Sequence, residues 1–109
     1  MKKQLKYDEQ TLTYLNLYNR AIDISESYLG IRSMMAKART DVVDSRKVKG
    51  FRYLMKHYPD SVIREGIWRM MSNPFCNGRR KGYARPAQLN WLIDPKHPER
   101  FYDLLEGTL

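Results

Sequence analysis

The sequence predicts an all-α protein, a compact bundle of four to six helices with one long loop rich in glycine and basic residues. Apolar side chains recur at the three- and four-residue spacing of a helix in several separate segments. No Asn-Gly or Asp-Gly pair lies between two alternating apolar runs, the pattern that best indicates a β-hairpin. The length of 109 residues suits a single domain, and a hydrophobic content of 42% is ordinary for a globular protein.

Two helices are expected before residue 40. Residues 8–29 carry apolar side chains at helical spacing, with acidic residues near the first turn, where the helix dipole favours negative charge. Gly30 is expected to end this helix, and residues 31–39 are expected to continue as a second short one. The side chains expected on the inner faces are Leu12, Leu15, Tyr18 or Ala21, Ile22, Leu29, Met34, Met35 and Ala38.

A third helix is expected within residues 41–58, with Asp44 or Thr40 as its N-cap and Pro59 as its end. Gly50 lies inside this helix. Because an interior glycine costs about 1 kcal/mol of helix propensity, we expect another element to pack closely against it. The apolar stripe consists of Val48, Phe51, Leu54 or Met55, and Tyr58.

Turn-forming residues divide the remainder of the chain. Proline and glycine punctuate it, and apolar residues recur at helical spacing between them. The expected elements are a helix from Pro59 to Asn73, the long loop over 74–86, a short helix over 87–93, and a last helix from Pro98 to Gly107.

The formal charge of +8 favours an anionic partner. In the long loop, cations surround an aromatic ring between glycines, a mixture suited to phosphates and stacked bases of a single strand. A second basic cluster lies on the third expected helix, mainly away from its apolar stripe. A solvated connection between helices is the alternative interpretation of the loop. The candidate nucleic-acid-binding residues are Arg79, Arg80, Lys81, Tyr83, Arg85, Lys47, Lys49, Arg52 and Lys56.

The sequence offers little support for catalysis. His57 and His97 are far apart, Cys76 is a single cysteine, and a metal site needs three or four ligands at suitable spacing. The glycines of the basic loop do not match a P-loop. We therefore expect no enzyme activity, cofactor or metal. One cysteine, no long apolar stretch and no signal-peptide pattern lead us to expect a cytoplasmic protein without membrane contact.

The two tryptophans are interpreted differently. Trp91 lies in a short apolar run, which favours a core or half-core role over base stacking. Trp68 lies off the apolar stripe of its helix and fits either a partner surface or the edge of the core. A protein-interaction or oligomerisation surface would use Trp68, Tyr14, Tyr18, Met34, Met35, Met70 and Met71, although the same methionines also fit an ordinary core.

Short matches in a fixed order carry a family resemblance. They are Phe75 and Gly78, then Gly82-Tyr83, then Leu89, Trp91, Leu92 and Ile93, and finally Leu105-Glu106-Gly107. In this order, residues 40–109 resemble the C-terminal module of DnaD-like replisome organisers, the replication-initiation proteins of phages and mobile elements. The chain departs from the family pattern at Cys76, where Leu is usual, at Tyr83, where Trp is usual, and at the final Thr108-Leu109, where Asn-Tyr is usual.

The resemblance implies a role in DNA replication, since proteins of that family help to open an origin and recruit a helicase. Together with the basic loop, it leads us to expect a non-catalytic accessory module that binds single-stranded DNA independently of sequence, with a replicative helicase or its loader as a protein partner. In the family this module follows a winged-helix domain, for which residues 1–39 are too short. We therefore expect one helical domain over 1–109, with 1–39 as a helical extension and 40–109 as the module. It would be a detached fragment or a small stand-alone relative. The alternative is an interaction or homo-oligomerisation module without DNA contact.

Overall fold

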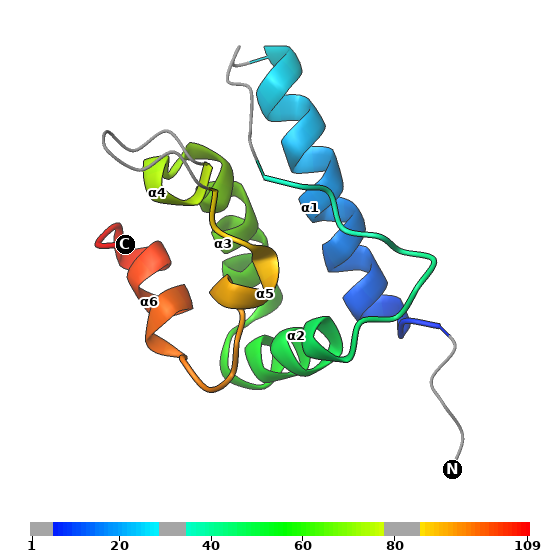
Figure 1. Ribbon diagram of the computed structural model, residues 1–109. Coiled ribbons are helices and arrows are strands. Elements are labelled where there is room, and N and C mark those ends of the chain that lie inside the picture. The colour runs from blue at the N-terminus through cyan, green and yellow to red at the C-terminus, as the bar shows by residue number, and fades with distance from the viewer. Residues whose placement is uncertain (1–5, 29–34, 78–85) are drawn as a thin grey trace.

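The computed structural model describes residues 6–28, 35–77 and 86–109, and the regular secondary structure within these ranges is entirely α-helical (Figure 1). The predicted fold class, an α-helical bundle of four to six helices, is confirmed. The helices are α1 (Glu9–Tyr28), α2 (Ser45–His57), α3 (Asp60–Ser72), α4 (Pro74–Asn77), α5 (Leu89–Leu92) and α6 (Glu99–Glu106).

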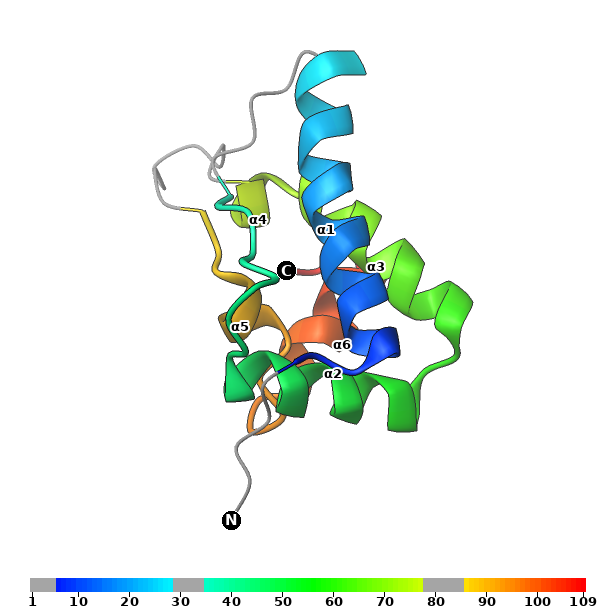
Figure 2. The ribbon, with the colours of Figure 1, turned by 90° about the vertical axis from the view of Figure 1, so that its right-hand side faces the viewer.

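Helix α3 is central to the packing, since it contacts α1, α2, α4 and α6. The long helix α1 lies along one side of α3 and α6 along another, while α2 crosses below them (Figures 1 and 2). The short helix α5 packs on α2, and the chain then continues into α6. Buried apolar side chains from every helix form one hydrophobic cluster.

Helix α1 contributes a buried face to this cluster. Tyr14 stacks on Phe51 of α2 with ring centroids 5.6 Å apart, and its hydroxyl donates a hydrogen bond of 2.7 Å to Asp60 of α3. The buried side chains of α1 are Thr11, Tyr14, Leu15, Tyr18, Ala21, Ile22 and Ser25. The predicted register of this helix is therefore right over its described part. Thr11, Tyr14 and Ser25 are buried in addition, and Leu12 is only partly buried.

The prediction of a helix over residues 31–39 is wrong for residues 35–39, the part that the structure describes. Residues 35–39 have no helical hydrogen bonding. The side chain of Asn19 accepts a hydrogen bond from the Ala38 N–H at 2.7 Å and donates one to the Ala38 carbonyl at 2.9 Å. These two bonds hold the segment beside α1. The Ala38 N–H and carbonyl thus bond to a side chain of another element instead of to a helical backbone. Residues 29–34 lie outside the described ranges, so the predictions for Leu29, Gly30 and Met34 fall outside them too.

The later boundaries follow local chemistry. The Asn73 side chain accepts hydrogen bonds from the N–H groups of Phe75 and Cys76, and these bonds start α4 inside the segment predicted as loop. Helix α5 is shorter than the predicted 87–93. Gly107 ends α6 with a positive φ of 77°, as predicted from its position.

Two glycines allow helices to approach closely. A Cβ on Gly50 would lie 2.6 Å from Ile93 Cγ1 and 2.7 Å from the Ile93 carbonyl oxygen. The close packing predicted at Gly50 is therefore confirmed, and its partner is the residue that follows α5. A Cβ on Gly66 would collide with the ring of Phe101, so Gly66 lets α6 lie against α3.

Candidate nucleic-acid interface

Asp44 fixes the start of α2. Its carboxylate accepts hydrogen bonds from the Arg46 N–H at 2.9 Å and from the Asn90 side-chain amide at 2.9 Å. The Asp44 N–H donates to the Tyr7 hydroxyl at 2.7 Å. Burial raises the pKa of the Asp44 carboxyl, but hydrogen bonds from Asn90, Arg46 and Lys47 outweigh it and lower the pKa to about 2. Asp44 is thus the N-cap of α2, which was predicted to be either Asp44 or Thr40.

The outer face of α2 is positively charged. Lys49, Arg52 and Lys56 are spaced by three and four residues, which places them within about 60° of one another around the helix axis. All three are exposed, whereas Phe51 and Leu54 on the opposite side and Val48 at the edge of this face are buried. The sequence of α2 contains no acidic residue, and exposed Arg46 flanks the same face. We call Arg46, Lys49, Arg52 and Lys56 the basic face.

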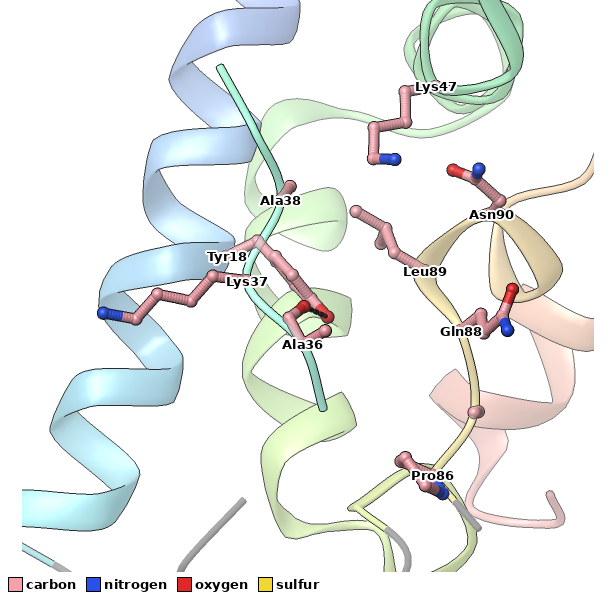
Figure 3. Close-up of a pocket in the computed structure, with 10 residues that line it drawn as sticks. Tyr18, Ala36, Lys37, Ala38, Lys47, Pro86, Gln88, Leu89 and Asn90 are labelled. Carbon is pink, nitrogen blue, oxygen red and sulfur yellow. Dashed lines mark hydrogen bonds between the residues drawn. The ribbon is translucent and has the colours of Figure 1, made fainter. Parts of the chain in front are cut away.

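Lys47 does not belong to the basic face, although it was predicted with it. Its side chain is only 16% exposed, and its Nζ lies 3.2 Å from the Asp44 carboxylate. Figure 3 shows Lys47 directed from α2 into a pocket of about 410 Å³ between the 36–38 segment and α5. The wall of this pocket is mostly apolar, with Tyr18, Ala36 and Leu89 among its residues.

A second pocket, of about 390 Å³, opens beside the basic face. Arg46 and Lys49 line it from α2, Lys96 lines it from the segment after α5, and Arg100 lines it from α6, so four cations belong to its lining. Its lining residues are Arg46, Lys49, Gln88, Asn90, Trp91, Asp94, Pro95, Lys96 and Arg100. We call this the α2–α5 pocket.

Trp91 is the aromatic wall of the α2–α5 pocket. The guanidinium carbon of Arg100 lies 4.0 Å from the centroid of its ring system, and Arg100 Nη1 donates a hydrogen bond of 3.1 Å to the Trp91 carbonyl. The centroid of the Phe75 ring lies 5.6 Å from that of the Trp91 ring. Trp91 is partly buried against the core, as predicted, and it also reaches the pocket.

Two carboxylates lie near this positive surface besides Asp44. Asp94 lines the pocket, and its Oδ1 accepts a hydrogen bond from the Lys96 N–H at 2.9 Å. Burial raises the pKa of Asp8, while hydrogen bonds from Thr11 and the nearby charge of Arg52 bring it below the ordinary value. Because the cations outnumber these carboxylates, an anion gains from binding at this surface.

The remaining predicted residues divide into two groups. The loop candidates Arg79, Arg80, Lys81, Tyr83 and Arg85 lie outside the described residues. Of the residues considered for an apolar partner surface, Tyr14, Tyr18, Met35, Met70 and Met71 are buried in the core, so they cannot form such a surface. Trp68 of α3 is 39% exposed and remains available.

Several pocket residues were not predicted from the sequence. Arg46 could have been found, because it neighbours Lys49 on one helix. Lys96 and Arg100 follow α5 and carry no local signal that connects them with α2. Their position depends on the packing of α5 at Gly50.

The described ranges contain no group of three or more His, Cys, Asp or Glu side chains placed to hold a metal ion. Burial raises the pKa of the Cys76 thiol to about 12, which disfavours the nucleophilic thiolate. No helix in the part of the chain that the structure describes has the length and apolar character to cross a membrane. Comparison of the chain with protein-family models, with curated proteins and with solved structures finds no match.

Proposed function

We propose that this protein is a non-catalytic module that binds single-stranded DNA independently of sequence, with the basic face of α2 as its described contact surface. The observation that carries the proposal is the stripe of Lys49, Arg52 and Lys56 on a helix without acidic residues. Phosphates are bound by such rows of cations, and the contacts carry no sequence information.

The dimensions of the basic face set the expected salt dependence. From Arg46 to Lys56 the helix rises about 15 Å, at 1.5 Å per residue. A face of this length with four cations would contact about three or four phosphates. For single strands, each phosphate contact contributes about −0.7 to the slope of log affinity against log salt concentration. We therefore expect a slope of about −2 to −3 from the basic face alone.

Arg79, Arg80, Lys81, Tyr83 and Arg85 stay predicted contacts, and each phosphate that the loop cations bind would steepen the slope further. The family resemblance of residues 40–109 adds a context to the proposal. It is an accessory role in DNA replication of a phage or mobile element, in the cytoplasm, next to a replicative helicase or its loader. The single cysteine of the chain suits that compartment.

The test is a titration of a fluorescently labelled 20-nucleotide strand, followed by anisotropy at several salt concentrations. The variant Lys49→Glu/Arg52→Glu/Lys56→Glu reverses the basic face and should weaken binding at least tenfold at low salt. A matched control reverses three exposed cations elsewhere, Arg20→Glu, Lys37→Glu and Arg69→Glu, with the same change in net charge. Circular dichroism checks that both variants remain helical.

The outcomes separate a specific surface from general charge. If both triple variants weaken binding equally, net charge alone explains the affinity and the assignment to α2 is wrong. If the wild-type protein does not bind the strand at low salt, the proposed function itself is wrong.

A protein-interaction module is the second candidate, and the exposure of Trp68 favours it. Tyr102 of α6 is also exposed, at 54%. Light scattering of the wild type and of Trp68→Ala at high concentration tests homo-oligomerisation. A concentration-dependent increase in mass that Trp68→Ala abolishes would support it, and a monomer in both proteins would contradict it.

A further inference from the structure

The α2–α5 pocket contains two kinds of binding group, and a phosphate alone would use only the first of them. One is cationic, with Arg46 and Lys49 of α2 and Lys96 of the segment after α5 in the lining. The other is the stacked pair of Trp91 and Arg100. Its volume of about 390 Å³ falls in the range of about 300–1,000 Å³ that is typical of pockets for small molecules.

The stacked pair is fixed in place before any ligand arrives. Arg100 is held from both directions, since its guanidinium lies over the indole while Nη1 bonds the Trp91 carbonyl. Phe75 packs near the same indole from α4. A preorganised π surface of this kind costs little to order when a planar ligand stacks on it.

We propose that the α2–α5 pocket binds one unpaired nucleotide of the strand that the basic face holds, so that this inference rests on the proposed function. The phosphate is bound by Arg46, Lys49 and Lys96. The base stacks against the Trp91–Arg100 pair, and the Asp94 carboxylate accepts a hydrogen bond from a base N–H group. The pocket therefore selects single strands over duplexes, because a paired base cannot leave its stack without a cost in free energy.

The position of the pocket supports this division of roles. Lys49 belongs both to the basic face and to the pocket lining. A strand that runs along Lys56, Arg52 and Lys49 therefore reaches the mouth of the pocket without crossing an acidic residue of α2. The phosphate contacts fix the strand, and the pocket receives the base at its end.

The test uses the fluorescence of Trp91. The chain has two tryptophans, so Trp68→Phe makes Trp91 the only one. We expect oligo(dT) of 12 nucleotides to change Trp91 fluorescence, with the same midpoint as the anisotropy titration. A closed hairpin duplex and inorganic phosphate at equal phosphate concentration should leave it unchanged. In the same background, Lys96→Glu should weaken oligo(dT) binding at least threefold, whereas Lys37→Glu should not.

Each outcome decides a different point. If the strand binds by anisotropy while Trp91 fluorescence does not change, the pocket inference is wrong and the proposed function stands. If inorganic phosphate or the duplex changes the fluorescence as strongly as oligo(dT), the pocket does not recognise an unpaired base, and the inference is overturned. If no strand binds at all, the proposed function and the inference are both wrong.

Discussion

The substitution Gly50→Ala should destabilise this protein, although the same change stabilises most helices. In an exposed helix interior, alanine is favoured over glycine by about 1 kcal/mol. Here the new Cβ would lie 2.6 Å from Ile93 Cγ1 and 2.7 Å from the Ile93 carbonyl oxygen. The side chain of Ile93 can change rotamer, but its carbonyl belongs to the backbone that ends α5. The segment after α5 must therefore move.

Overpacking of this kind costs about 1–3 kcal/mol, and contact with a backbone atom places Gly50→Ala toward the upper end. After subtraction of the gain in helix propensity, we expect a net loss of about 1–2 kcal/mol. For a domain of about 100 residues, that loss lowers Tm by about 4–15 °C.

The assay is thermal unfolding followed by circular dichroism, supported by urea titration. The matched control is Lys49→Ala, the adjacent exposed residue, which should change stability by no more than about 0.5 kcal/mol. A Tm for Gly50→Ala equal to or above that of the wild type would refute the reasoning. It would mean that α5 moves away from α2 without cost.

Three other changes follow from the described contacts. Gly66→Ala should lower Tm as well, because its Cβ collides with the Phe101 ring. The Asp44 carboxyl has a lowered pKa of about 2, so the stability that it contributes is present above pH 4 and is lost as the pH falls toward 2. Urea titrations should show a loss of about 1–2 kcal/mol over this range after allowance for solvent screening, and a smaller loss in Asp44→Asn. Cys76 should react with a thiol reagent at pH 8 only as fast as the protein opens, since it is buried with a raised pKa; rapid labelling of the native protein would contradict this.

Much of the fold could be predicted because its signals are local. The N-cap at Asp44 and the glycine end of α6 each depend on a few neighbouring residues. The close packing at Gly50 could be predicted from a glycine inside a helix, but its distant partner, Ile93, could not. The error at residues 35–39 has a different origin. The spacing of Met35 and Ala38 suits a helix, but the Asn19 side chain binds the Ala38 backbone and competes with helical hydrogen bonds. Such a tertiary contact leaves no periodic pattern in the sequence.

The same distinction applies to the candidate site. The stripe on α2 could be predicted from three- and four-residue spacing. Lys47 falls off it because two positions before Lys49 correspond to a turn of about 200° around the helix axis. The α2–α5 pocket could not be predicted. It brings Lys49 next to Lys96 and Arg100, and their proximity depends on how α5 packs. The sequence predicted Trp91 to be a packing residue. That its ring also lines the pocket depends on how α5 and α6 are arranged in space.

The hydrogen bond between Asp44 and Asn90 has a consequence for the motions of the protein. It ties the first turn of α2 to α5, while the Asp44 N–H ties the same point to Tyr7 before α1. A fluctuation that frays the start of α2 therefore breaks a bond to α5 and loosens the wall of the pocket. We therefore expect these segments to open as one cooperative unit, so that the surface proposed for phosphates and the pocket proposed for a base become available, or are lost, together.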